Sequence, residues 1–214
     1  MRHWPQDILL TRRGLITCVA GLVVGKASYA GLTPTPTQTA GPFYPDVIPA
    51  DSDADLTRIG NAQTVASGEI VEVSGRILSV KGHALPDAVV EIWQADANGR
   101  YLDGGDGGGG RGRDRRFQGY GMVKTRASGE YRFRTVRPAP YGTGAFRRTP
   151  HIHFRVLHGS YGELVTQMYF PGEPLNDRDM LYRSMTSNLA RDAATAQLHR
   201  GGEVPHYSFD LVLA

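Results

Sequence analysis

Cysteine is nearly absent from this chain of 214 residues, because Cys18 is the only one. It lies inside an apolar N-terminal run, and removal of that segment would leave a chain without cysteine. Such a chain can form no disulfide and can offer no thiolate to a metal ion. Disulfide-stapled folds and cysteine zinc sites are therefore excluded, and histidine, carboxylate and tyrosine remain as candidate ligands.

A long apolar run is also lacking. The longest one, Leu15–Gly25, is too short to span a bilayer. It follows Arg12 and Arg13 and precedes the small-residue site Ser28-Tyr29-Ala30, an arrangement that predicts an export signal over residues 1–30. The arginine pair resembles a twin-arginine signal, with an ordinary secretory signal as the alternative. We expect a periplasmic or extracellular protein.

Excess charge of one sign is lacking once this signal is set aside. Residues 1–30 hold four basic residues against Asp7, which accounts for the whole net charge of +3. The remaining chain is close to neutral. No nucleic acid or anionic membrane is therefore expected among its partners.

Helical periodicity is scarce and is confined to residues 176–200. Alternating or apolar runs bounded by turn residues predict strands elsewhere, at residues 69–80, 88–95, 120–125, 130–136, 151–158, 163–170 and 206–213. The fold class expected is all-β, a β-sandwich of about seven to eight strands with a short C-terminal helical segment. Residues 31–68 are expected to form an extended N-terminal arm, and residues 69–214 the sandwich domain.

A glycine-rich loop covers residues 103–116. Gly105 to Gly110 formally fit the dinucleotide pattern G-x-G-x-x-G. No amphipathic helix follows, and a glycine run satisfies the pattern trivially, so we reject a nucleotide site. The function of this loop is left open.

The stretch from Tyr141 to His153 holds the densest chemistry of the chain. If a strand begins at His151, alternation places His151 and His153 on one face and Ile152 and Phe154 on the other. Two imidazoles side by side on a rigid element are half of a metal site.

Tyrosines are the candidates for the other half. No carboxylate has the spacing of H-E-x-x-H or of a facial triad, which weakens a zinc hydrolase interpretation. Tyr101 and Tyr141 each follow a predicted strand, where functional side chains concentrate. A phenol of pKa about 10 binds as phenolate only to a strong Lewis acid. Two phenolates with two imidazoles would suit ferric iron. The alternatives without a metal site are that the two histidines face solvent, that the tyrosines pack at the edge of the fold, and that Arg148 is an ordinary surface charge.

Five segments together resemble the intradiol ring-cleavage dioxygenases, the family of protocatechuate 3,4-dioxygenase and catechol 1,2-dioxygenase. The resemblance runs from about Gln38 to Pro174 and follows the family's order. Its segments are QTAGPFYP, PDAVVEIWQADANGRY, FQGYGMVKTRASGEYRFRTVRPAPY, RTPHIHF and LVTQMYF.

This resemblance implies a mononuclear non-haem Fe(III) centre. Its ligands would be Tyr101, Tyr141, His151 and His153, with Tyr141 as the phenolate that leaves when substrate binds. Arg148 matches the arginine that lies over the substrate ring.

Four further positions follow from the same resemblance. Gln167 matches a glutamine that lies behind the iron ligands, and Gly41, Pro42 and Tyr44 are candidates for contact with substrate.

The implied reaction inserts both atoms of O₂ into a catechol and gives a cis,cis-muconate. The layout is nearer the protocatechuate type, because the long N-terminal helical segment of catechol enzymes is lacking. GTGAF follows Tyr141 where protocatechuate enzymes carry an aromatic wall, so the ring substituent stays open. A homo-oligomer is compatible with the sequence. The alternative is a non-catalytic, prealbumin-like sandwich that only binds a ligand.

Overall fold

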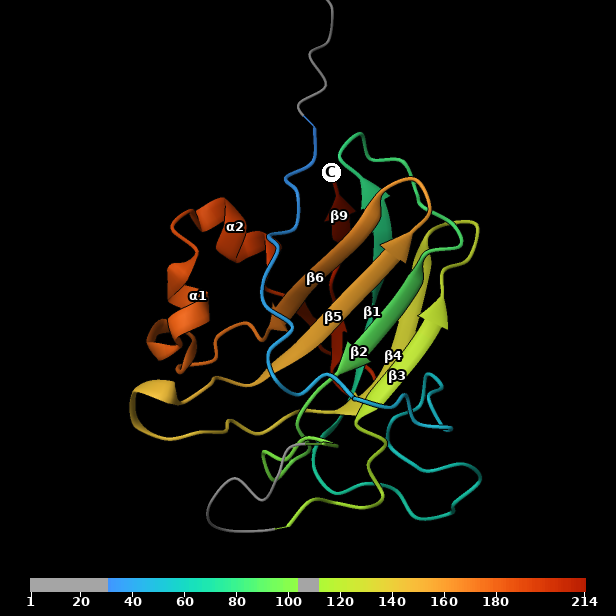
Figure 1. Ribbon diagram of the computed structural model, residues 1–214, viewed down its shortest axis with the longest axis vertical. Helices are drawn as coiled ribbons and strands as arrows, with labels where there is room; N and C mark the ends of the chain where they lie inside the picture. The colour runs from blue at the N-terminus through green and yellow to red at the C-terminus, as the bar shows by residue number, and fades with distance from the viewer. Residues whose placement is uncertain (1–30, 104–111) are drawn as a thin grey trace, which may run out of the picture.

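The computed structural model describes residues 31–103 and 112–214, and within them the protein is an all-β sandwich, as predicted (Figure 1). One sheet has the order β4-β1-β8-β7, with β9 also paired to β1, and the other has the order β3-β2-β5-β6. The expected export signal (residues 1–30) and the glycine run (residues 104–111) lie outside the described residues.

The described residues contain nine strands, two short α-helices and two 3₁₀ turns. The strands are β1 (Ile70–Ser79), β2 (Val89–Trp93), β3 (Tyr120–Lys124), β4 (Glu130–Val136), β5 (His151–His158), β6 (Gly162–Tyr169), β7 (Gln197–His199), β8 (His206–Ser208) and β9 (Leu211–Leu213). The helical elements are η1 (Gly144–Phe146), η2 (Asn176–Arg178), α1 (Met180–Ser184) and α2 (Asn188–Ala193).

Strand β5 shows how alternation builds the core. Ile152, Phe154 and Val156 are fully buried between the two sheets. The intervening His151 and His153 therefore point to the opposite face of the β3-β2-β5-β6 sheet. This confirms the predicted division of the H-x-H strand into an apolar face and an imidazole face.

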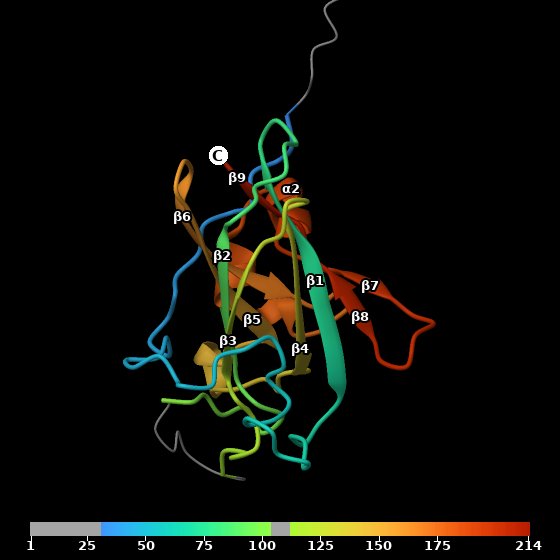
Figure 2. The same cartoon turned by 90° about the vertical axis from the view of Figure 1, so that its right-hand side faces the viewer.

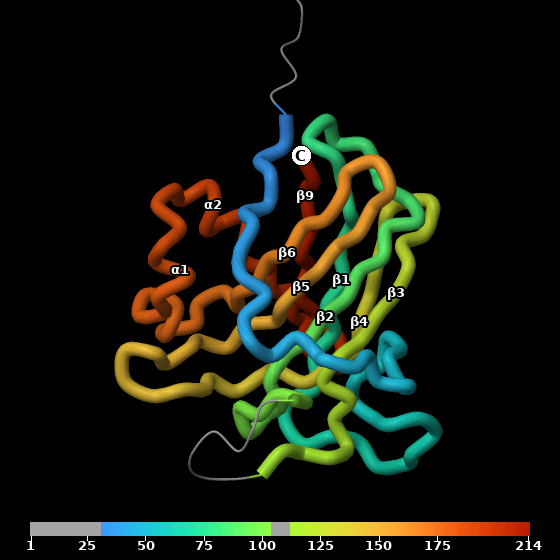
Figure 3. The backbone as a smooth tube through the Cα atoms, viewed as in Figure 1, coloured from blue at the N-terminus to red at the C-terminus, as the bar shows by residue number. Residues whose placement is uncertain are grey.

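The imidazole face is buried as well, because the N-terminal arm crosses it (Figures 1 and 3). Gln38 donates its backbone N–H to the Val165 carbonyl at 2.8 Å, which fixes the arm beside β6. Trp93 and His153, which face the arm, are each only 1% exposed. The turned view shows the arm on the outer side of this sheet (Figure 2).

The predicted strand over residues 206–213 is wrong as a single strand. It is divided into β8 and β9, which both run parallel to β1. The division falls where the Phe209 carbonyl crosses Gly75 so closely that a Cβ there would lie 2.0 Å from its oxygen. The Tyr131 hydroxyl donates a hydrogen bond to the same Phe209 carbonyl. This hydrogen bond and the close approach of Gly75 together fix the position of that carbonyl.

The helical expectation for residues 176–200 is correct only in part. Helix α2 ends at Ala193, and β7 then pairs antiparallel with β8. No helix within residues 31–103 and 112–214 combines the length and hydropathy needed to cross a membrane.

Candidate metal centre

The structure brings the four predicted ligands together on the imidazole face. The hydroxyl oxygen of Tyr101 lies 3.3 Å from His151 Nε2, and that nitrogen lies 3.2 Å from His153 Nε2. The ring of Tyr141 lies 5.2 Å from the ring of Tyr101 and 5.7 Å from that of His151, between centroids. Tyr101, which is forty or more positions from the other three in sequence, therefore meets them in space.

A carboxylate turn positions Tyr101. Asp96, fully buried after β2, accepts the backbone N–H groups of Asn98 and Arg100 at 2.8 and 2.9 Å. Its other oxygen accepts the N–H of Asp114 at 2.7 Å. These hydrogen bonds connect the turn before Tyr101 to Asp114, which lies near the C-terminal end of the glycine-rich loop.

A short antiparallel bridge positions Tyr141 beside Arg148. Each donates its backbone N–H to the other's carbonyl, at 3.3 Å from Tyr141 and 2.8 Å from Arg148. The loop between them turns back through Gly142, where φ is +75° and a Cβ would lie 2.5 Å from the Phe146 carbonyl oxygen. Glycine is required there, because another residue would meet both strain and a clash.

The histidine rings are oriented by different partners. His151 Nδ1 lies 2.6 Å from the Thr149 carbonyl, so Nδ1 carries the proton and Nε2 presents a lone pair. His153 is held by Trp93, whose ring is stacked on it at 4.8 Å. His153 Nδ1 is buried and has no hydrogen-bond partner among the described residues.

Burial sets the protonation of all four groups. It raises the pKa of Tyr101 well above its ordinary value, with the nearby Tyr141 adding to the effect. It also raises the pKa of Tyr141, although the charge of Arg148 acts in the opposite direction. It lowers the pKa of His151 to about 3, helped by Arg148, and it lowers that of His153 strongly.

This donor set fits a hard, highly charged cation. Two neutral imidazoles offer lone pairs, and two phenols of raised pKa give up their protons only to a strong Lewis acid. No group of three or more histidine, cysteine, aspartate or glutamate residues in the described chain could hold a metal ion.

Gln167, which the family resemblance implies lies behind the iron ligands, is paired with His153 across β5 and β6. Its side-chain oxygen accepts from Arg148 Nη2 at 2.5 Å, and its side-chain amide donates to the Thr39 carbonyl at 3.1 Å. Tyr169 also donates to that oxygen, at 3.3 Å. The glutamine thus joins Arg148 to the N-terminal arm.

Of the three candidate residues on the arm, the structure places Gly41 next to His153 and Tyr44 away from the candidate ligand atoms. A Cβ on Gly41 would lie 3.6 Å from His153 Cε1, and Pro42 follows it at the surface. Tyr44 instead donates to Glu91 at 2.8 Å and sets its ring edge against Trp93. Its hydroxyl is engaged away from the ligand atoms.

Three contributors were not found from sequence. Phe43 is stacked on Tyr101 with centroids 4.5 Å apart; its place in QTAGPFYP was the available signal. Trp93 holds His153, and only the pairing of β2 with β5 places it there. Asp179 accepts a hydrogen bond from Arg148 Nε at 2.7 Å. The only sequence feature that could have pointed to Asp179 is its position as the N-cap residue of α1.

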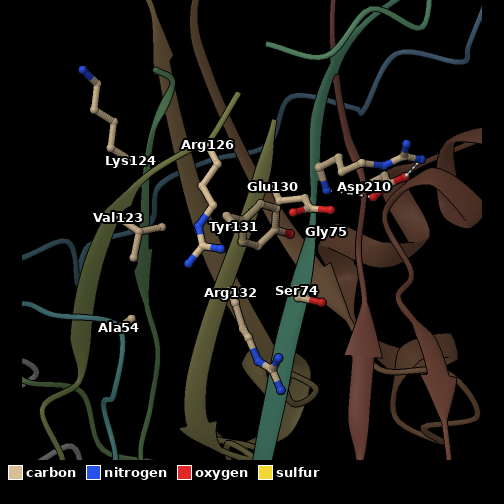
Figure 4. A pocket seen from close by; sticks show the side chains of 11 residues that line it. Ala54, Ser74, Gly75, Val123, Lys124, Arg126, Glu130, Tyr131, Arg132 and Asp210 are labelled. Carbon is tan, nitrogen blue, oxygen red and sulfur yellow. Dashed lines mark hydrogen bonds and ion pairs between the residues drawn. The ribbon is translucent and has the colours of Figure 1, made fainter. Parts of the chain in front are cut away.

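A separate depression of about 630 Å³ is lined by residues of β1 and β4 from one sheet and of β3 from the other (Figure 4). Charged side chains dominate its lining, including Arg76, Arg126 and Asp210. None of the predicted ligands lines it, so it is distinct from the candidate metal centre.

Comparison with known proteins agrees with this geometry. A family model described as Dioxygenase matches residues 39–214. The chain is 36% identical over 176 residues to the protocatechuate 3,4-dioxygenase beta chain of Burkholderia cepacia, covering 78% of this chain and 73% of that one. This chain belongs to the dioxygenase family. It is an intradiol ring-cleavage dioxygenase and thus an oxidoreductase.

Two other relatives show the breadth of the family. A hydroxyquinol 1,2-dioxygenase of Nocardioides simplex is 28% identical over 195 residues, covering 81% of this chain and 62% of that protein. The dioxygenase domain of a dioxygenase carbohydrate-binding protein fusion from Streptomyces sp. SirexAA-E has a TM-score of 0.63 and 28% identity. It covers 85% of this chain and 98% of that domain. Family membership replaces the alternative of a non-catalytic binding module.

Proposed function

We propose that this dioxygenase holds one Fe(III) ion between Tyr101, Tyr141, His151 and His153 and cleaves a catechol between its two hydroxylated carbons. The observation that supports this best is that His151 Nε2 lies 3.3 Å from the Tyr101 hydroxyl oxygen and 3.2 Å from His153 Nε2 in a buried site. When bound, the ferric ion supplies a Lewis acid that binds the catechol oxygens and makes the ring reactive toward O₂.

The two phenols would have different tasks. Tyr101 is 3% exposed and stacked against Phe43, so it is held in place. Tyr141 is partly exposed and borders the loop at residues 142–147. We assign to the Tyr141 oxygen the acceptance of a proton from an incoming catechol hydroxyl.

Arg148 would provide fixed positive charge beside the substrate. Its guanidinium is held by Gln167 and Asp179, and its side chain is only 12% exposed. A cation held in a site of low dielectric stabilises negative charge that builds up on the ring and on the attacking oxygen.

The substrate class proposed is a substituted catechol, with a layout near the protocatechuate type. The similarity to a protocatechuate 3,4-dioxygenase beta chain supports this. The wall after Tyr141 is built from the small residues Gly142 to Ala145, which are exposed. Such a wall leaves room for a ring substituent.

The test is oxygen uptake by the purified protein with catechol, protocatechuate and hydroxyquinol, with ring-cleavage products followed by absorbance. We expect stoichiometric iron, a visible tyrosinate-to-iron band, and loss of both band and turnover on chelation. Arg148→Ala should keep iron and colour but lose most turnover. A colourless, iron-replete protein, or full turnover in Arg148→Ala, would contradict the proposal.

Two further proposals concern the whole protein. We propose export through the twin-arginine-like signal, which replacement of Arg12 and Arg13 by lysine should block in cell fractionation. The relatives named as alpha and beta chains of one enzyme support self-association of this chain. Sedimentation at several concentrations tests that.

A further inference from the structure

Asp179 makes an unusually complete set of contacts at the edge of the candidate metal centre. Its side chain is fully buried, and Oδ2 accepts from Arg148 Nε at 2.7 Å and from the Thr149 backbone N–H at 2.9 Å. Oδ1 accepts the backbone N–H groups of Leu181 and Tyr182 at 2.9 and 3.0 Å. One carboxylate therefore caps helix α1 and also binds the Arg148 guanidinium.

The guanidinium of Arg148 is consequently fixed at two points. Asp179 accepts a hydrogen bond from Nε, and Gln167 accepts one from Nη2 on another edge of the same planar group. Two contacts on a rigid plane define its orientation, whereas Gln167 alone would leave the group free to turn about one contact. The carboxylate also offsets the cost of burying a positive charge.

We propose that Asp179 is a positioning residue for this reaction, which holds the Arg148 guanidinium at the angle needed to face the substrate. This inference rests on the proposed role of Arg148. The hydrogen bonds of the Asp179 carboxylate go to Arg148, Thr149, Leu181 and Tyr182 and to none of the four candidate ligand side chains. Its effect on turnover would therefore pass through Arg148 and leave the metal in place.

The variant Asp179→Asn separates these tasks. The side-chain amide of asparagine has one oxygen acceptor where aspartate has two. If that oxygen accepts from Arg148 and Thr149, its NH₂ group faces the backbone N–H groups of α1, and in the opposite orientation the NH₂ group faces Arg148 and Thr149. We expect the folded, iron-loaded variant to show kcat lower by roughly 10–100-fold, with KM changed little. Iron content and the visible spectrum should match the wild type.

Asp210→Asn is the matched control. Asp210 also accepts a backbone N–H and an arginine side chain, from Arg76 at 2.8 and 3.2 Å, but it lies in the separate depression lined by residues of β1, β3 and β4 (Figure 4). We expect wild-type kcat in this variant. A loss of kcat equal to that of Asp179→Asn would overturn the proposal.

A second arm uses Arg148→Lys, alone and combined with Asp179→Asn. Lysine lacks the guanidinium Nε–H group from which Asp179 accepts a hydrogen bond. In the Arg148→Lys background, adding Asp179→Asn should therefore lower the remaining turnover by less than about twofold. An equal fold-loss in both backgrounds, or loss of iron together with turnover, would refute positioning through Arg148. If Asp179→Asn does not fold, Asp179→Ser retains a capping oxygen but cannot reach the arginine, and the same loss of kcat is expected.

The outcomes also distinguish this inference from the function on which it rests. A slow Arg148→Lys with a fully active Asp179→Asn would overturn the role of Asp179 and leave that of Arg148 intact. A fully active Arg148→Ala would overturn both.

Discussion

The indole of Trp93 lies nearly parallel to the imidazole of His153, with an interplanar angle of 11° and centroids 4.8 Å apart. The two residues are directly paired between β2 and β5, so the stack is built into the sheet register. His153 receives no hydrogen bond at Nδ1 among the described residues, and the stack is therefore the main restraint on its ring.

Removing this restraint should loosen the metal. In Trp93→Ala we expect iron affinity to fall by about tenfold or more and stability by about 3–5 kcal/mol, because a large buried side chain is lost. Trp93→Phe keeps an aromatic face and removes only an indole N–H that is itself unpaired, so it should retain iron and most activity. Iron titration and urea unfolding measure both effects. Undiminished iron affinity in Trp93→Ala would show that the stack does not orient the ligand.

Replacing Tyr101 by phenylalanine should change the colour of the protein. The variant keeps the stack on Phe43 but removes one phenolate, so we expect weaker iron binding, a shifted and weaker visible band, and little turnover. Tyr131→Phe is the control, since Tyr131 is a buried tyrosine whose hydroxyl donates to a carbonyl outside this site. It should lose only about 1 kcal/mol of stability and keep the spectrum. Unaltered spectra in both variants would argue against ligation by Tyr101.

Gly41 should be intolerant of a side chain for a local reason. Its φ is +68°, which strains alanine by about 1 kcal/mol, and the added Cβ would lie 3.6 Å from His153 Cε1. Gly162→Ala provides the same backbone strain, at φ +72°, with nothing within 4 Å of the new Cβ. We expect similar losses of stability in both variants but lower turnover only in Gly41→Ala. Equal turnover would mean that substrate does not approach Gly41.

The Asp179–Arg148 pair predicts a defined acid sensitivity. Burial alone would raise the pKa of Asp179, but the hydrogen bond and charge of Arg148 outweigh it and hold the pKa below the ordinary value of 3.8. A depressed carboxyl pKa stabilises the fold above that ordinary value, and this contribution is lost as pH falls through the lower, folded-state value. The stability difference between wild type and Asp179→Asn should therefore be constant above about pH 5 and shrink at lower pH. Urea unfolding of the metal-free proteins from pH 7 to 3 measures it; a difference that widens on acidification would contradict the sign.

Local patterns in the sequence were sufficient for strands β1 to β6 and for the two faces of β5. Alternation has a period of two residues, so His151 and His153 could be assigned to one side without knowledge of the fold. Their position after predicted strands made Tyr101 and Tyr141 candidate ligands, the family resemblance implied the same pair, and the structure places both beside those histidines.

Contacts that depend on tertiary packing could not be predicted. Arg148 and Asp179 are 31 positions apart and meet only because η2 and α1 fold back on the end of β5. The break in the predicted strand at 206–213 arises from the crossing of Phe209 over Gly75, which no local pattern marks. The alanine-rich residues after α2 favour a helix by propensity, but pairing of β7 with β8 outweighs that preference.

The N-terminal arm is anchored to β9 as well as to β6. Thr35 donates its N–H to the Val212 carbonyl at 3.0 Å, and its hydroxyl accepts the Val212 N–H at 2.9 Å. Segments near opposite ends of the described chain must therefore meet before Gly41 and Phe43 can settle over the ligands. During synthesis on the ribosome this cannot happen until residue 212 has emerged. Iron at the proposed site would therefore enter a pocket that is completed later than the hairpin that carries both histidines.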